Sequence, residues 1–130
     1  MIGRVPGIAT LFVLAACGSD AGGAVDVALR TEQGPFVGTL TIDPNPPHVG
    51  EHRVVIMLDE SADPLEGAAV MLSPWMPAHG HGSTDVDAVE REPGVYVAEH
   101  VWLNMPGIWD LRVRVDGEEP GALIATVEVP

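Results

Sequence analysis

The segment PWMPAHGHGS, residues 74–83, places three side chains that can bind metal ions within six positions. Met76 supplies a thioether, and His79 and His81 supply two imidazoles. Imidazole suits copper and zinc, whereas thioether ligands select Cu(I). His79 and His81 are two residues apart, so in an extended segment their side chains lie on the same face. The surrounding Pro and Gly predict a loop whose glycines let the backbone fold around an ion.

The same loop also has a purely structural interpretation. The prolines and glycines would shape a long turn, and His79 and His81 would hydrogen-bond it in place. Met76 and the more distant Met105 would then pack as apolar caps over the end of the domain. The two interpretations differ in whether the imidazoles converge on each other or turn inward to hold the loop.

Seven segments with period-two alternation, separated by turn residues, are the predicted strands. Frequent turn signals and the lack of helical periodicity predict an all-β fold, a single seven-stranded immunoglobulin-like β-sandwich. In one of these strands we expect the face with Tyr96, His100 and Trp102 to be buried, with His100 partly buried and hydrogen-bonded. The predicted strands are residues 37–42, 53–58, 68–75, 85–90, 95–103, 108–115 and 122–129.

If successive strands run antiparallel, odd-numbered connections lie at one end of the domain and even-numbered connections at the other. The odd-numbered ones, residues 43–52, 76–84 and 104–107, carry four of the histidines and define what we call the histidine end. His48 and His52 could therefore act as secondary ligands beside Met76, His79, His81 and Met105. The even-numbered connections, residues 59–67, 91–94 and 116–121, carry acidic residues and define the acidic end. The first predicted strand starts at the acidic end, so we expect the N-terminal tether to attach there.

The N-terminal residues indicate export. Residues 1–16 contain one Arg and a short apolar run, as in a secretory signal peptide. Leu14-Ala15-Ala16-Cys17 resembles a bacterial lipobox, which implies cleavage before Cys17, lipidation of Cys17 and anchoring to a membrane. Residues 17–35 would be the lipidated Cys and a flexible linker, and residues 36–130 the folded domain. The alternative is an ordinary secreted protein. In both cases the chain is extracytoplasmic, in the periplasm or at the cell surface.

Composition narrows the function further. The chain has 130 residues, a formal charge of −13, no Lys and only six Arg, so a nucleic-acid partner is excluded. Cys17 is the only cysteine. Once it is lipidated the domain has no thiolate for a metal, and any soft-metal site must use Met and His.

Two stretches, LEGAAVMLSPWMPAHGHG and EPGVYVAEHVWLNMPGIWDLRVRVDG, resemble the YtkA-like domain, which is related in pattern to FixH-type proteins. The shared features are a G-A-x-V strand, an M-P-x-H-G-H-G loop, then P-G-x-Y and M-x-G-x-W. The resemblance covers residues 40–129. It implies an extracytoplasmic immunoglobulin-like β-sandwich with a link to copper handling or respiratory-oxidase biogenesis. Met76, His79, His81 and Met105 occupy matching motif positions. FixH-type proteins carry a membrane anchor helix where this chain has a lipobox.

The sequence does not predict an enzyme. It contains no G-x-S-x-G nucleophile motif, and it is too short for the fold that uses one. Two hypotheses follow. The first is a lipid-anchored metal-binding module that handles copper through the His/Met cluster. The second is a structural or protein-interaction domain of the cell envelope, with an envelope protein as its partner and with histidines that serve only as scaffold.

Overall fold

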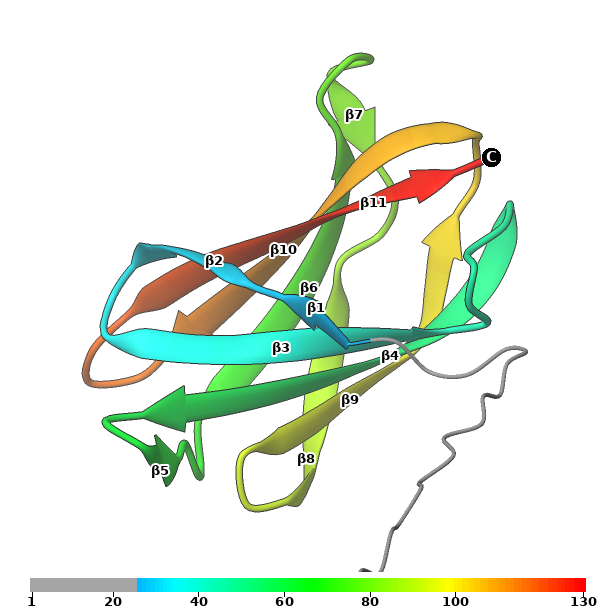
Figure 1. The fold of residues 1–130 in the computed structure, drawn as a ribbon. Helices are drawn as coiled ribbons and strands as arrows, with labels where there is room; N and C mark the ends of the chain where they lie inside the picture. The colour runs from blue at the N-terminus through cyan, green and yellow to red at the C-terminus, as the bar shows by residue number, and fades with distance from the viewer. Residues whose placement is uncertain (1–25) are drawn as a thin grey trace, which may run out of the picture.

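The computed structural model describes residues 26–130, so the predicted signal peptide and the lipidation of Cys17 lie outside the described residues. The described part is all-β, with eleven strands in one antiparallel sheet (Figure 1). The strands are β1 (Asp26–Ala28), β2 (Arg30–Gln33), β3 (Phe36–Asp43), β4 (Gly50–Glu60), β5 (Asp63–Pro64), β6 (Ala69–Met76), β7 (His81–Gly82), β8 (Val86–Glu92), β9 (Val95–Leu103), β10 (Gly107–Asp116) and β11 (Gly121–Val129). Across residues 26–130, no helix has the length and apolar character needed to span a bilayer.

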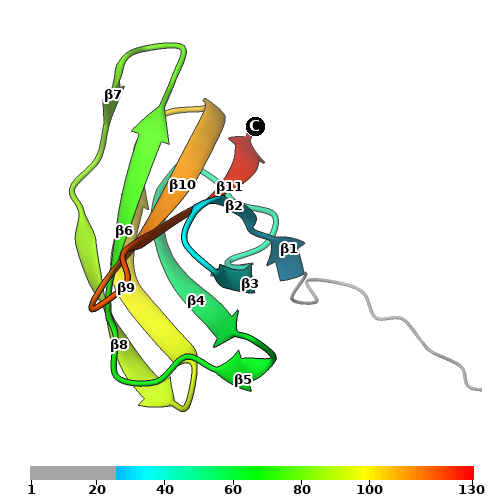
Figure 2. The same ribbon diagram turned by 90° about the vertical axis from the view of Figure 1, so that its left-hand side faces the viewer.

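The all-β prediction is confirmed, and each of the seven predicted strands is found as one of the longer strands, β3, β4, β6, β8, β9, β10 and β11. The total of seven is wrong, because four strands of two to four residues are added. Such short strands carry too few positions to show a period of two. The sheet is nearly closed into a barrel, with the order β1-β3-β4-β9-β8-β6-β10-β11-β2 (Figures 1 and 2).

Residues 26–33, which we expected to belong to the linker, bring the sheet close to closure. β1 pairs with β3 and β2 pairs with β11, so the two terminal strands of the sheet are neighbours in sequence. Leu29, between them, is buried, and its N–H donates to the Gly38 carbonyl at 3.0 Å. Residues 26–33 therefore belong to the folded part, and the predicted linker boundary at residue 35 is corrected.

The core is formed by the inward-facing side chains of the long strands. On β4, for example, Val54, Ile56 and Leu58 are buried while the residues between them are not. Trp109 is the largest fully buried side chain, and its indole N–H donates to the Met105 carbonyl at 3.0 Å. This hydrogen bond satisfies the polar atom of a buried indole and ties the β9–β10 turn to the core.

A β-bulge reverses the alternation of β9. His52 pairs with Val101 and Val54 pairs with Ala98, so two residues of β9 lie opposite the single residue Arg53. His100 is one of the two, with a φ of 60°, which is unusual for a residue with a side chain.

The bulge overturns the prediction that His100 and Trp102 are buried. Beyond it, Val101 and Leu103 point inward, and Trp102 turns outward with half of its surface exposed. His100 is exposed and bonds the carboxylate of Glu51, which raises the pKa of His100.

The separation of the two ends is as predicted. At the histidine end, Gly50 of the first connection pairs with Leu103, next to the 104–107 turn. The attachment point of the tether is not as predicted. Asp26 pairs with Thr41, close to the end of β3 that leads into the first histidine connection, because β1 runs antiparallel to β3. The described chain therefore starts near the histidine end, not at the acidic end.

Candidate metal site at the histidine end

The hairpin between β6 and β7 is shaped by its glycines. The backbone N–H groups of His79 and Gly80 both donate to the Met76 carbonyl, at 3.1 and 2.9 Å. Gly80 has a φ of 67°, which favours glycine. A Cβ atom added to Gly82 would lie 2.0 Å from the Pro74 carbonyl oxygen, so only glycine fits there. The hairpin thus requires the two glycines of the H-G-H-G pattern, and these observations do not require its histidines.

The hairpin brings the two imidazoles together. The ring centroids of His79 and His81 are 5.6 Å apart, with 34° between the ring planes. A metal–nitrogen bond of about 2.0 Å puts an imidazole centroid roughly 3 Å from the ion, so two ligating rings have centroids about 5–6 Å apart. Both residues are exposed, and neither ring makes a hydrogen bond within residues 26–130. The two rings are exposed neighbours at a separation compatible with the metal interpretation, and they do not hold the loop through hydrogen bonds within residues 26–130.

Met76 lies on the same side of the hairpin as His81. The two residues are cross-strand partners in the antiparallel β6–β7 pair, and directly opposed residues project to one face. Met76 is 1% exposed, whereas His81 is exposed. The hairpin therefore joins two accessible imidazoles to a buried thioether from the residue paired with one of them.

Met105 occupies the neighbouring turn. It is partly buried and packs against the core. Two residues later, Gly107 closely approaches Met76, since a Cβ atom added there would lie 2.8 Å from the Met76 Cε. The structure thus places Met76, His79 and His81 in one hairpin and Met105 in the turn that Met76 contacts.

The second histidine pair includes one residue, His52, with a structural role. His48 and His52 have ring centroids 5.1 Å apart, but His52 is only 2% exposed. Its Nε2 accepts the backbone N–H of His48 at 3.2 Å, and its Nδ1 donates to the Gly50 carbonyl at 3.1 Å. Burial lowers the pKa of His52 and favours this neutral form. With both ring nitrogens engaged, His52 holds the first connection in place and fits poorly as a secondary ligand.

Nitrogen and oxygen ligands alone do not assemble a site in the described chain. Between residues 26 and 130, no three His, Cys, Asp or Glu side chains lie close enough to share an ion. A site at the β6–β7 hairpin would therefore combine two imidazoles with thioether sulfur. This donor set fits Cu(I) among the ions that proteins bind.

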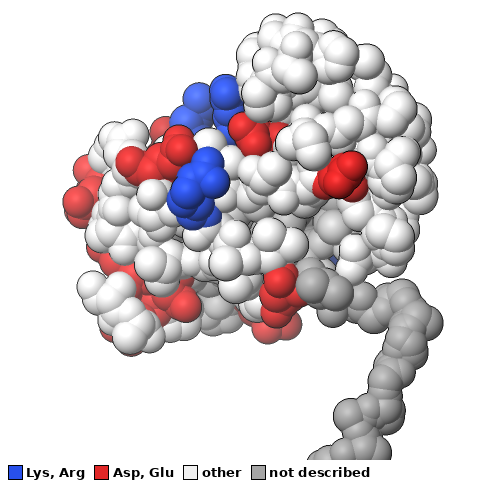
Figure 3. Space-filling model, turned by 45° about the horizontal axis from the view of Figure 1, so that its top comes forward, with Lys and Arg blue, Asp and Glu red and all other residues white. Residues whose placement is uncertain are grey.

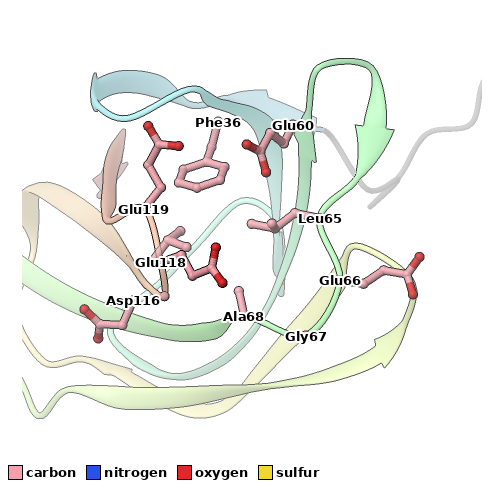
Figure 4. A pocket seen from close by; sticks show the side chains of 11 residues that line it. Phe36, Glu60, Leu65, Glu66, Gly67, Ala68, Asp116, Glu118 and Glu119 are labelled. Carbon is pink, nitrogen blue, oxygen red and sulfur yellow. The ribbon is translucent and has the colours of Figure 1, made fainter.

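The acidic end has a different character. A pocket there has Phe36, Leu65 and Ala68 among its apolar lining, and Glu60 and Glu119 stand at its rim (Figure 4). Its wall is held by Tyr96, whose hydroxyl donates to the Leu65 carbonyl at 2.7 Å and accepts the Ala68 N–H at 3.2 Å. The lining of the pocket includes residues of two even-numbered connections, 59–67 and 116–121, which therefore lie at one end, as the strand order predicts.

The fold and the hairpin define a class: a small all-β domain that carries a His/Met hairpin at one end of a nearly closed sheet. The YtkA-like family matches residues 26–114, and the chain belongs to that family. No curated protein and no solved structure matches the chain.

Trp102 is a surface residue that the sequence pattern does not predict. The alternation of β9 predicts a buried side chain, yet Trp102 is 50% exposed beside the β7–β8 segment. The bulge that turns it outward depends on a positive φ at His100, and no residue type marks that position in the sequence.

Proposed function

We propose that this protein is a lipid-anchored, extracytoplasmic metal-binding module that handles copper through the hairpin of Met76, His79 and His81. The observation that carries the proposal is the closeness of the two exposed imidazoles, whose ring centroids are 5.6 Å apart, in a hairpin where His81 is the cross-strand partner of Met76. Met105, in the turn that Met76 contacts, would supply a second sulfur. When bound, Cu(I) would be held by this mixed nitrogen and sulfur donor set.

The imidazole and thioether ligands would have different roles in copper binding. The exposed imidazoles of His79 and His81 can meet an ion that arrives from solution or from another protein. The thioether of Met76 is shielded from water and would favour the reduced, softer ion. We infer a chaperone or sensor role and no enzymatic activity.

The anchor and the finer fold belong to the same proposal. Cys17 would carry the lipid and hold the domain at the outer side of a membrane, in the periplasm or at the cell surface. The seven longer strands would correspond to an immunoglobulin-like sandwich whose two sheets are joined through β8. This interpretation is supported by the pairing of β8 with β9 on one side and with β6 on the other.

An equilibrium titration of the full chain with Cu(I), in competition with a chromophoric chelator, tests the proposal. We expect one ion bound more tightly than about micromolar, roughly −8 kcal/mol. The double variant His79→Ala/His81→Ala should lose this binding. Weaker binding by the unmodified chain, or unchanged binding by the double variant, would remove the basis of the proposal.

A second candidate is a structural or protein-interaction domain of the envelope. It is favoured by the large apolar side chains on the surface, of which Val37 and Val89 are at least half exposed. In that case His79 and His81 would be scaffold, and their replacement would lower stability whether or not metal is present.

A further inference from the structure

Trp102 is the one tryptophan whose indole is open to solvent in residues 26–130. Trp109 is fully buried, and Trp75 is partly buried with the Arg112 guanidinium 5.0 Å above its ring. Trp102 is half exposed and follows the β9 bulge, which turns it to the outer face. Exposure of so large an apolar side chain is costly and commonly marks a binding site.

The indole borders an open hollow of about 610 Å³ whose other lining residues are Gly82, Ser83, Thr84 and Asn104. None of the lining residues is charged, although the whole chain has a formal charge of −13. In Figure 3 the charged side chains gather mainly on the left, and the upper right, where the histidine end lies, is mostly white.

Two hydrogen bonds of Ser83 hold the hollow in shape. The Ser83 hydroxyl donates to the Trp102 carbonyl at 2.5 Å, and the Ser83 N–H donates to the Pro74 carbonyl at 3.2 Å. These two hydrogen bonds connect the segment after β7 to both β9 and β6. The amide of Asn104 and the hydroxyl of Thr84 make no hydrogen bond within residues 26–130, so both are open to a ligand.

The chemistry of the lining selects the class of ligand. A nucleotide would bring phosphates to a strongly acidic protein, and a cation would find no carboxylate among the lining residues. An acyl chain would contact the indole but would exchange no hydrogen bonds with the exposed amide and hydroxyl groups. A sugar ring has an apolar face that can stack on an indole and a rim of hydroxyls that exchange hydrogen bonds with an amide and a hydroxyl.

We propose that this hollow binds a neutral saccharide chain, with one sugar ring stacked on Trp102 and its hydroxyls bonded to Asn104 and Thr84. Gly82 of the hollow directly follows His81, but the proposed sugar-binding residues Trp102, Asn104 and Thr84 are not among the proposed copper ligands, so the two proposals can be tested independently.

The full chain can be titrated with two neutral probes, chitotetraose and maltotetraose, while the indole N–H signals are followed by NMR. The signal of Trp102 should shift with at least one probe, and those of Trp75 and Trp109 should stay in place. Trp102→Ala should weaken binding at least about tenfold, which corresponds to 1.4 kcal/mol. Trp102→Phe should retain part of the affinity, and Asn104→Ala should reduce it.

Ile108→Ala is the matched control, because Ile108 is 46% exposed and lies outside the lining. It should bind as the unmodified chain does. The proposal is overturned if neither probe shifts the Trp102 signal at about 10 mM, a concentration that detects even millimolar binding. It is also overturned if a folded Trp102→Ala variant, with an unchanged melting temperature, binds with unchanged affinity.

Discussion

Met76 and His81 are direct cross-strand partners, one buried in the core and the other exposed to solvent. The pair links the stability of the domain to the proposed site, since the thioether that would bind an ion also fills space in the core. His79 joins them from the turn, with its ring 5.6 Å from that of His81. Core packing and ligation can therefore be separated by choosing substitutions that alter only one of them.

Met76→Leu removes the sulfur and nearly conserves the volume. We expect a change in the free energy of unfolding below about 1.5 kcal/mol, because volume-conserving apolar exchanges are tolerated in cores. The affinity for Cu(I) should fall at least about tenfold. Chelator competition measures the affinity, and urea denaturation the stability. Met57→Leu, on the exposed side of β4, is the control and should change neither quantity. Unchanged Cu(I) affinity in Met76→Leu would exclude Met76 as a ligand.

His79→Ala/His81→Ala separates the two functional hypotheses. Both side chains are exposed and make no hydrogen bonds within residues 26–130, so without metal the free energy of unfolding should change by less than about 0.5 kcal/mol. Excess Cu(I) should raise the melting temperature of the unmodified chain only, since a ligand at about 100 times its Kd contributes roughly 2.7 kcal/mol. A large loss of stability in the metal-free variant would favour the scaffold hypothesis.

The stability of the protein should depend on pH through His52. Burial lowers the pKa of His52 below its usual 6.5, so the unfolded chain binds the proton more tightly than the folded one. The contribution of His52 is fully present above pH 6.5 and is lost as the pH falls through its lowered folded pKa. Urea denaturation of metal-free protein between about pH 8 and 5 measures this loss in the free energy of unfolding. His52→Gln should flatten the acid side of the profile.

His100 has the opposite effect on the pH dependence of stability. Its bond to Glu51 raises its pKa, so its contribution is present below pH 6.5 and is lost as the pH rises through the raised value. The His100 side chain is 79% exposed and the pair is screened by solvent, so His100→Gln should change the pH profile of stability little. If His100→Gln removed the acid-side loss of stability and His52→Gln left it intact, the role assigned to His52 would be wrong.

Gly107→Ala should disturb both the fold and the site. The residue has a φ of 132°, and a Cβ atom there would lie 2.8 Å from the Met76 Cε. We expect a loss of about 1–3 kcal/mol in the free energy of unfolding and weaker Cu(I) binding, because the Met76 side chain must move. Gly117→Ala is the control, with no atom within 4 Å of the added Cβ, and it should be neutral. Equal stability of the two variants in thermal denaturation would contradict the contact.

Most of the long strands could be predicted from the sequence because they carry an alternation over a buried face; β8, which has no buried residue, and β9, whose alternation is broken by the bulge, are the exceptions. In β10, for example, Trp109, Leu111 and Val113 are buried and Arg112 is exposed, as the period of two requires. The four short strands could not be predicted, because pairing with a long neighbour, rather than their own pattern, places them in the sheet. The predicted attachment point of the tether was wrong for the same reason, because the short strand β1 runs antiparallel to β3 and places the start of the described chain near the histidine end.

The closeness of the candidate ligands His79 and His81 could be predicted from their spacing, whereas the rest of the geometry at the histidine end could not. The spacing of His79 and His81 around Gly80 indicates a turn that places both rings on one side, and the structure has this arrangement. The roles of His52 and Trp102 could not be inferred. The role of His52 depends on its burial beneath the first connection. The exposure of Trp102 depends on a bulge whose positive φ falls at His100.

X-ray absorption at the copper edge, recorded on the full chain loaded with one equivalent of Cu(I), tests the ligand set itself. The proposal predicts two imidazole nitrogen scatterers together with one or two sulfur scatterers. The sulfur contribution should decrease in Met76→Leu, and the imidazole contribution should disappear in His79→Ala/His81→Ala. A spectrum without sulfur, or a chain that does not retain one equivalent of Cu(I) after desalting, would contradict a His/Met copper site at this hairpin.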